Sequence, residues 1–362
     1  MENFISVFSE VADPRAANAR HDLSEILFIA LAAVLCGAES CADMAEFGAA
    51  KEGLLRRVLR LEHGIPSHDT FSRVFRLLDP EAFEAVFRRF MAAFAQELRG
   101  VVAIDGKALR GAFERGQQAT PLHLVNVWAV EQGLAVAQRI APGRNEVAGA
   151  LDVIQLLSLK GCTVTADALH CHARMAQAVL ERGGAYVLAL KENQSALFAE
   201  ALARFEQPTG HDEFAEQRSK SHDRLEQRRA LVVEAPALAE RHGFPGIQAL
   251  ARIEALRQSA GKTPELKARH FVLSDRLSPA RLLQVVRSHW SIENQLHWLL
   301  DVAFNEDGAR TRKGNGPQNL AILRKLALNL LRAEPSKTSI RRKIKRAGWD
   351  DAFLTSLLAH MR

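Results

Sequence analysis

Cysteine, aromatic residues and long apolar runs are scarce in this sequence of 362 residues. The four cysteines form no Cys-x-x-Cys pair, which argues against a zinc ribbon or a disulfide framework and favours a reducing compartment. The longest apolar run, residues 26–36, is too short for the roughly 20 residues of a membrane-spanning helix. No basic segment followed by an apolar stretch opens the sequence, so no signal peptide is expected. The sequence therefore predicts a cytoplasmic protein without a membrane partner.

Aromatic residues make up 6% of the chain and include a single tyrosine, which argues against a surface that binds single-stranded nucleic acid by base stacking. Apolar residues make up 48%, which is enough for a sizeable core, and the length suggests two or three structural units. The formal net charge is +6 at pH 7. That excess is compatible with a polyanionic partner but does not prove one.

Residues 1–98 predict helices throughout. A proline-led helix begins after Asp79 and carries a stripe of phenylalanines that we expect in the core. Another helix is expected to begin at Ser67 and to carry Arg73 and Arg76. With the turn before it, this helix could belong to a nucleic-acid-binding helix pair. The same arginines could equally form an ordinary solvated face, and the sequence leaves both possibilities open.

The stretch around Asp105 is the first candidate for chemistry. Residues 101–104 are apolar and predict a short buried strand, which ends at Asp105 and is followed by Gly106 and Lys107. An ionised carboxylate at the end of a buried strand must be exposed, paired or bound to a cation, because desolvation is costly. The alternative is that Asp105 and Gly106 simply begin a turn.

Strands and helices alternate after this first strand. The predicted elements are a polar loop at 106–120, strands at 122–130 and 134–140, a helix at 145–157, a strand at 162–166, a helix at 171–182 and a strand at 185–190. This order predicts a mixed sheet with helices on its faces. The strands that end at Asp105 and Asp167 should then be parallel neighbours, with both carboxylates at one edge. Two carboxylates so close repel unless they share a proton or a divalent cation.

The pattern is less regular between about 205 and 276, where we predict a β-rich insertion. Its expected strands are 226–233, 247–256 and 269–273. Ser278 can then cap a helix that runs to about 287.

Helical spacing places His289, Glu293 and His297 on one stripe of the next segment. Glu293 could join Asp105 and Asp167 as an oxygen ligand, with the histidines positioning phosphate or water. The two histidines and Glu293 could instead bind zinc, although the usual helical zinc motif places the glutamate directly after the first histidine. The stripe could also be an internal polar network without chemistry. Spacing alone leaves all three open.

Several longer motifs resemble bacterial insertion-sequence transposases of the DDE class, in the branch that includes the H-repeat-associated proteins of Rhs elements. The residues that carry the resemblance are 21–23, 35–38, 64–71, 103–107, 164–168, 190–194, 289–298, 304–307 and 327–331. The sequence departs from the family pattern at 169–172, at Glu192, where a glycine is usual, and at 222–224, where His-Asp-Arg replaces His-Gly-Arg.

The resemblance implies an α/β protein with an RNase H-like mixed-sheet catalytic domain at 99–335, interrupted by the insertion. The helical pattern of residues 1–98 predicts an all-α N-terminal domain that we expect to bind DNA, and we expect a basic C-terminal tail at 336–362. In the family, Asp105, Asp167 and Glu293 would be the acidic triad. Such a triad suits two Mg²⁺ ions, or Mn²⁺, because hard cations prefer oxygen ligands.

The implied activity is transposition: metal-dependent cleavage of double-stranded DNA at the element ends, followed by attack of the freed 3′-hydroxyl on target DNA, by a homodimer. The alternative is a domesticated, catalytically silent DNA-binding protein that keeps the fold. The candidates for DNA contacts are Lys107, Lys191, Arg287, His297, Arg310, Arg312 and Lys313. For Lys107, Lys191 and Arg287, ordinary surface charge is the competing interpretation. A basic cluster at 341–346 is also suited to phosphate contacts.

Overall fold

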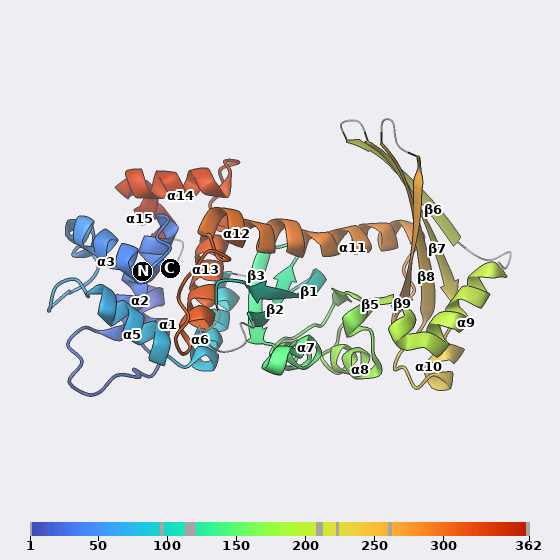
Figure 1. Ribbon diagram of the computed structural model, residues 1–362, viewed down its shortest axis with the longest axis horizontal. Helices are drawn as coiled ribbons and strands as arrows, with labels where there is room; N and C mark the ends of the chain where they lie inside the picture. The colour runs from blue at the N-terminus through green and yellow to red at the C-terminus, as the bar shows by residue number, and fades with distance from the viewer. Residues whose placement is uncertain are drawn as a thin grey trace.

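A single mixed sheet runs through the protein and connects a helical end to an extended β end. The computed structural model describes residues 2–94, 98–112, 121–207, 213–221, 224–259 and 263–359. Within these residues nine strands lie in the order β3-β2-β1-β4-β5-β9-β8-β7-β6. In Figure 1 the first helices and the last helices gather at one end, β1–β5 lie in the middle, and β6–β9 stand at the other end.

The strand directions follow the expected mixed pattern. The strands are β1 (Gly100–Leu109), β2 (Leu122–Ala129), β3 (Leu134–Ile140), β4 (Cys162–Ala166), β5 (Ala185–Leu190), β6 (Glu213–Ser221), β7 (Arg224–Glu234), β8 (Ala249–Ser259) and β9 (Glu265–Leu273). β1, β2 and β3 are antiparallel neighbours, whereas β4 is parallel to β1 and β5 is parallel to β4. β9 is antiparallel to β5 and starts the run of antiparallel strands that ends at β6.

Strand β1 is longer than the sequence predicts. Its ladder with β2 continues to the pair Leu109 and Leu122, so the segment that begins at Gly106 is strand, and the interpretation of Asp105 and Gly106 as a turn is wrong. The antiparallel partner supplies the extra hydrogen bonds that extend the strand. The rest of the expected loop, residues 113–120, lies outside the described residues.

The β-rich segment after β5 contains the three expected strands as β7, β8 and β9, and adds β6. Because β9 pairs with β5, these four strands continue the central sheet and do not form a separate one. Two helices, α9 (Ser195–Glu206) and the short α10 (Ala237–Arg241), accompany them. Residues 222 and 223 of the motif at 222–224 lie outside the part of the chain that the structure describes.

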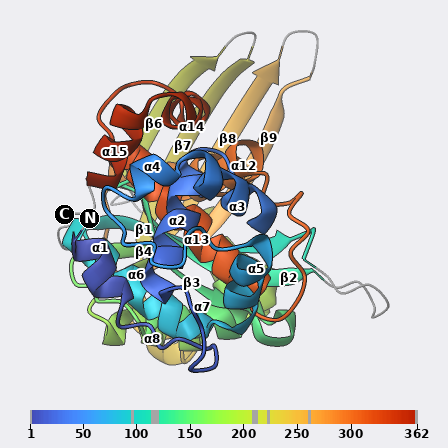
Figure 2. The ribbon, with the colours of Figure 1, turned by 90° about the vertical axis from the view of Figure 1, so that its left-hand side faces the viewer.

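Helices alone precede the sheet in the described residues. They are α1 (Glu2–Phe8), α2 (Leu23–Leu35), α3 (Cys41–Ala50), α4 (Glu52–Leu55), α5 (His68–Leu77) and α6 (Pro80–Phe94). Every residue of α2 except Glu25 is buried, as expected for a helix that is apolar on all sides. Figure 2 shows α2 beside α13 (Gly316–Ala333), so elements from the two ends of the chain share one core.

Helices cover both faces of the central strands. α7 (Glu146–Ile154) packs on β2 and β3, and α8 (Ala173–Glu181) packs on β5. α11 (Pro279–Ser291) crosses β1, β4 and β7 on the other face (Figure 1). Neighbouring residues of β1 therefore enter different clusters: Val101 packs with α11, and Val102 joins the larger core.

The helix after Ser278 contains an irregularity that the sequence did not predict. α11 passes into a π-helix, Ile292–His297, and then into α12 (Trp298–Phe304). The N–H of Trp298 donates to the carbonyl of Glu293, five residues earlier, as in a π-helix. Such turns are frequent at functional sites.

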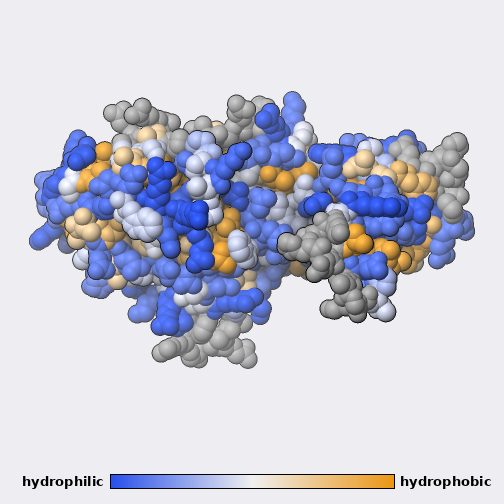
Figure 3. All heavy atoms as spheres, turned by 90° about the horizontal axis from the view of Figure 1, so that it is seen from above, coloured by the Kyte–Doolittle hydropathy of each residue, from blue (hydrophilic) through white to orange (hydrophobic). Residues whose placement is uncertain are grey.

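The C-terminal segment is helical and packed. It forms α14 (Ile340–Trp349) and α15 (Asp351–Ala359), which contact α2 and α13. Within the basic cluster, Lys343 is buried and donates to the carbonyls of Leu331 and Glu334, whereas the neighbouring basic residues are exposed. Figure 3 shows that the face above α11 and α14 is mostly hydrophilic. Across the described residues, no helix has the length and apolar character needed to cross a membrane.

Candidate metal-binding and catalytic site

Asp105 and Asp167 lie at matching positions of two parallel strands. The β1–β4 ladder ends at the pair Ala103 and Thr165, and each aspartate comes two residues later. The predicted parallel pairing of these strands is therefore confirmed. Asp105 still has Asn126 of β2 on its other side, so it is held by the sheet at the point where β4 has ended. Asp167 is exposed, and its carboxylate accepts from the N–H of Leu169 at 3.1 Å.

The π-helix brings two more side chains to this edge. A carboxylate oxygen of Asp105, one of Glu293 and a ring nitrogen of His297 all lie within 4.8 Å of one another. Asp167 is not part of this tight group, but it lines the same pocket as Asp105 and Glu293. Three acidic side chains thus converge from β1, from the end of β4 and from the π-helix.

The electrostatics of Asp105 favour a bound proton or cation. Burial, and then the negative charge and hydrogen bond of Glu293, raise the pKa of Asp105 to about 8. The charge of Asp167 acts in the same direction. A divalent cation would relieve this repulsion, and carboxylate oxygens are the ligands that Mg²⁺ prefers. The donor set therefore fits a hard divalent ion.

His297 contacts Asp105 and is neutral. Its Nδ1 lies 3.6 Å from Oδ2 of Asp105, and its Nε2 lies 3.2 Å from Nδ2 of Asn126. Because an amide nitrogen only donates, Nε2 must accept and the ring proton sits on Nδ1, facing Asp105. Burial, and then the positive charges of Lys107 and Lys325, lower the pKa of His297 to about 3.

The structure does not bring His289, Glu293 and His297 together in the way that a zinc site would need. His289 bonds through Nδ1 to the hydroxyl of Thr165 at 3.1 Å, and burial lowers its pKa. Within the described part of the chain, His289 does not join Glu293 and His297 in a metal-sized group. The Nε2 lone pair of His297 is already taken by Asn126. The π-helix explains the difference, because it changes the angular spacing that an α-helix would give.

Lys107 lies in an acidic cluster beyond the pocket. Its ammonium is 2.7 Å from Asp301 and 3.4 Å from Asp307, with Glu306 at 4.0 Å, and its side chain is 8% exposed. These ion pairs tie β1 to α12 and to the loop that follows. The contacts of Lys107 therefore give no support to the prediction that it binds phosphate.

His297, also predicted to contact DNA, is buried against Asp105 and Asn126, and its contacts give no support to that role. The remaining predicted DNA contacts fall in three places. Lys191 is exposed and lines the pocket of the three acidic residues. Arg287 is exposed on α11 beside a different pocket. Arg310 and Lys313 are exposed in the loop between α12 and α13, where Arg312 donates from Nε to the carbonyl of Gly111.

Sequence reasoning missed Asn126, Thr165 and Glu146. Asn126 is fully buried in the apolar run of β2, and a lone amide in such a run is the signal that could have found it. Glu146 accepts from or donates to His123 across 3.0 Å, depending on the protonation of the pair, and its carboxylate lies where a Cβ at Gly106 would be. A side chain at position 106 would therefore displace Glu146.

Comparisons with known proteins find relatives over nearly the whole chain. The family described as "Transposase DDE domain" matches residues 96–330, and one described as "DDE_Tnp_1-associated" matches residues 5–91. YbfL of Escherichia coli K12 is 31% identical over 99% of this chain and 98% of its own length. The H repeat-associated protein YhhI of the same strain is 31% identical over 94% of this chain and 93% of its own length.

Two further matches cover less of this chain or have a lower sequence identity. A protein in the dhlA 3′ region of Xanthobacter autotrophicus is 41% identical over 75% of this chain and 94% of its own length. A piggyBac transposase in a synaptic complex with hairpin DNA aligns with 98% of this chain and 77% of its own, at 11% identity and a TM-score of 0.44, a likeness too loose to carry an inference. The match over residues 96–330 covers well over half of the sequence, and the chain belongs to the DDE transposase family.

Proposed function

We propose that this protein is an insertion-sequence transposase that cleaves DNA at the element ends and joins the freed 3′-hydroxyl to target DNA. The observation that carries the proposal is the convergence of Asp105 and Glu293, with Asp167 in the same pocket. The mixed sheet and the position of the two aspartates beyond paired parallel strands support an RNase H-like catalytic domain at about 99–335. We further propose that residues 1–98 and the exposed basic residues at 341–346 contact DNA, and that the active form on DNA is a homodimer.

The three carboxylates would hold one or two Mg²⁺ or Mn²⁺ ions. Bound metal in such a site lowers the pKa of a water and stabilises the leaving 3′ oxygen. Within the chain, His297 directs its Nδ1 proton toward Asp105 and so limits the orientations of that carboxylate. Lys191, an exposed residue that lines the pocket, would bind a non-bridging oxygen of the phosphate being cleaved.

Cleavage of a supercoiled plasmid that carries the element with its own ends tests the proposal. The wild-type protein should nick or linearise the plasmid in Mg²⁺ and not in chelator. Asp105→Asn keeps the shape of the side chain but removes its charge, so it should abolish cleavage while DNA retention in a gel persists. Asp152→Asn, at an exposed carboxylate of α7, is the matched control and should cleave normally.

The alternative is a silent protein that binds DNA and keeps the fold. It predicts that the wild type retains DNA but never cleaves it, whatever metal is added. That result would refute the nuclease proposal, as would full cleavage by Asp105→Asn.

A further inference from the structure

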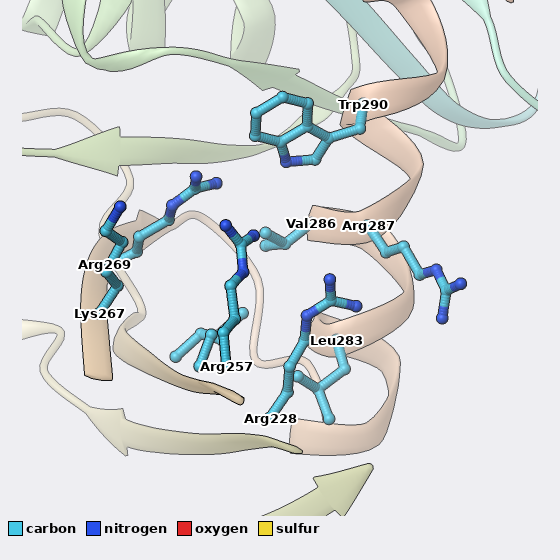
Figure 4. A pocket seen from close by; sticks show the side chains of 10 residues that line it. Arg228, Arg257, Lys267, Arg269, Leu283, Val286, Arg287 and Trp290 are labelled. Atoms are coloured by element: carbon cyan, nitrogen blue, oxygen red, sulfur yellow. The ribbon is translucent and has the colours of Figure 1, made fainter. Parts of the chain in front are cut away.

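A second pocket lies between α11 and the strands β7, β8 and β9, and basic side chains dominate it. Arg228, Arg257, Lys267, Arg269 and Arg287 line it together with Trp290. Figure 4 shows the guanidinium groups of Arg228, Arg257 and Arg269 in the space between the strands and the helix, with the indole of Trp290 at one end. Arg287 projects from the other side of the helix in this view.

Strand register places these basic residues on one face of the sheet. Arg228 pairs across with Ala255, which pairs with Lys267, and the next row joins Ile253 to Arg269. Cross-strand partners share a face, and so do residues two apart along a strand. The same face is apolar near α11 and becomes basic farther along the strands. The cluster therefore follows from the alternation of the strands.

The positive charges exceed the carboxylates that face them. Glu226 lies 2.9 Å from both Arg228 and Arg257, and Glu265 lies 2.8 Å from Lys267. Among the described residues, neither Arg269 nor Arg287 has a carboxylate within ion-pair distance. Four cationic side chains of the strands thus meet two carboxylates, which leaves the pocket electropositive.

Arg269 is held in place without an anion. Its guanidinium lies over the ring of Trp290, 5.2 Å from the centroid, which limits its rotamers. Burial, and then the positive charges of Arg257 and Arg228, lower the pKa of Arg269. An anion in the pocket would offset this repulsion. A planar guanidinium fixed in this way suits two oxygens of a phosphate group.

The basic pocket adjoins the acidic one. Arg269, Val286 and Trp290 line both pockets, so the two share a wall. A polyanionic strand with one phosphate at the carboxylates would therefore pass Arg269 as it leaves. The acidic pocket needs cations before it can accept a phosphate, whereas the basic pocket does not.

We propose that the pocket of Arg228, Arg257 and Arg269 binds the sugar–phosphate backbone of DNA next to the cleaved phosphate, and that it does so without metal. The identity of the ligand in this inference rests on the proposed function. The excess positive charge of the pocket indicates a polyanion, and the wall shared with the acidic pocket indicates that this polyanion is the strand being cut.

Binding of a fluorescent duplex of about 25 base pairs and arbitrary sequence, measured in chelator at about 50–200 mM salt, tests the proposal. Arg269→Gln should weaken binding about threefold or more and reduce the slope of log affinity against log salt by about 0.9, the loss expected for one phosphate contact. Arg269→Lys keeps the charge and should retain most of the slope. Arg281→Gln removes an exposed arginine of α11 that does not line the pocket, and should bind like the wild type.

Thermal melting of each variant serves as the control for correct folding. Arg257→Gln is a second variant that removes a positive charge from the pocket independently. If both glutamine variants melt normally but bind DNA with the wild-type affinity and slope, the proposal is wrong. The proposed function fails in a different way, because it predicts cleavage in Mg²⁺. If Arg269→Gln binds DNA more weakly but the wild type never cleaves it, the proposal that this pocket binds DNA stands and the proposal that the protein is a nuclease is refuted.

Discussion

Nδ2 of Asn126 donates to Nε2 of His297 across 3.2 Å, and this bond joins residues 171 positions apart. Asn126 stands opposite Asp105 in the β1–β2 ladder, so the bond connects the central sheet to the π-helix at the level of the acidic group. It also fixes the tautomer of His297, with Nδ1–H toward Asp105. We infer that Asn126 positions the site through His297 without contacting the substrate.

Replacing Asn126 with alanine should slow cleavage. His297 would lose the bond that sets its tautomer, and removal of an outer partner of this kind typically costs about 10–100-fold in activity or metal affinity. The measurement is the single-turnover cleavage rate as a function of Mg²⁺ concentration. DNA retention should not change.

Asn329→Ala is the matched control for this substitution. Asn329 is also buried, but it bonds to the backbone of Ala135, away from the pocket. It should lower the melting temperature without changing the cleavage rate of the folded protein. Equal rates in Asn126→Ala and Asn329→Ala would show that Asn126 has only a structural role.

The raised pKa of Asp105 predicts that stability depends on pH in the absence of metal. Between the ordinary pKa of 3.8 and the folded value of about 8, the folded state holds a proton that the unfolded state has released. The free energy of unfolding should therefore fall as pH rises through this interval. The fall should be about 1.4 kcal/mol for each unit by which the pKa of Asp105 is higher in the folded than in the unfolded state. Urea unfolding in chelator at several pH values measures the slope.

Comparison of Asp105→Asn with the wild type measures the contribution of this carboxyl together with its coupling to Glu293 and Asp167, since the titrations of groups that do not interact with Asp105 cancel. The variant should gain stability relative to the wild type as pH rises toward 8. Saturating Mg²⁺ should reduce the difference, because a bound cation favours the ionised carboxylate. A difference that stays constant across this interval would contradict the assignment.

Much of the site's arrangement could be predicted from sequence because it follows from strand order. The helix α7 connects β3 to β4, so β4 is expected to run parallel to β3 and therefore also to β1, which places Asp105 and Asp167 at one edge. The N-caps Asn145 and Ser278 likewise mark the starts of α7 and α11 as predicted. These features depend on local patterns.

Other features depend on contacts that no local pattern contains. The apolar spacing of Ile292 and Leu296 fits an α-helix, so the π-helix could not be predicted from it. Strand β6 is polar and lacks an apolar alternation, and its place at the sheet edge comes from pairing with β7. The acidic partners of Lys107 lie 194 or more positions away, so its sequence neighbours gave no sign of them.

Lys107→Met should destabilise the protein by about 3 kcal/mol, because it leaves Asp301 with no cation in a poorly solvated cluster. The double variant Lys107→Met/Asp301→Asn should recover part of the loss, and the non-additivity measures the pair directly. The salt dependence of DNA binding should stay at the wild-type slope. A slope reduced by about one unit would instead restore Lys107 as a phosphate contact.

Gly106→Ala should cost about 0.5–1.5 kcal/mol of stability, because the new methyl group would displace the carboxylate of Glu146 from its hydrogen bond with His123. Glu146 is held by His123 at 3.0 Å, so it cannot move without losing that contact. In the background of Glu146→Ala, the same substitution at Gly106 should cost much less. Equal costs in both backgrounds, measured by chemical unfolding, would exclude this steric explanation.

The central claim is that carboxylates distant in sequence share divalent metal. Crystals soaked in Mn²⁺ and measured for anomalous scattering test it most directly. The account predicts a peak about 2.0–2.4 Å from oxygens of both Asp105 and Glu293, with Asp167 as a ligand of the same ion or of a second one. A saturated crystal with no peak in this pocket, or with metal bound by His289 and no carboxylate, would contradict it.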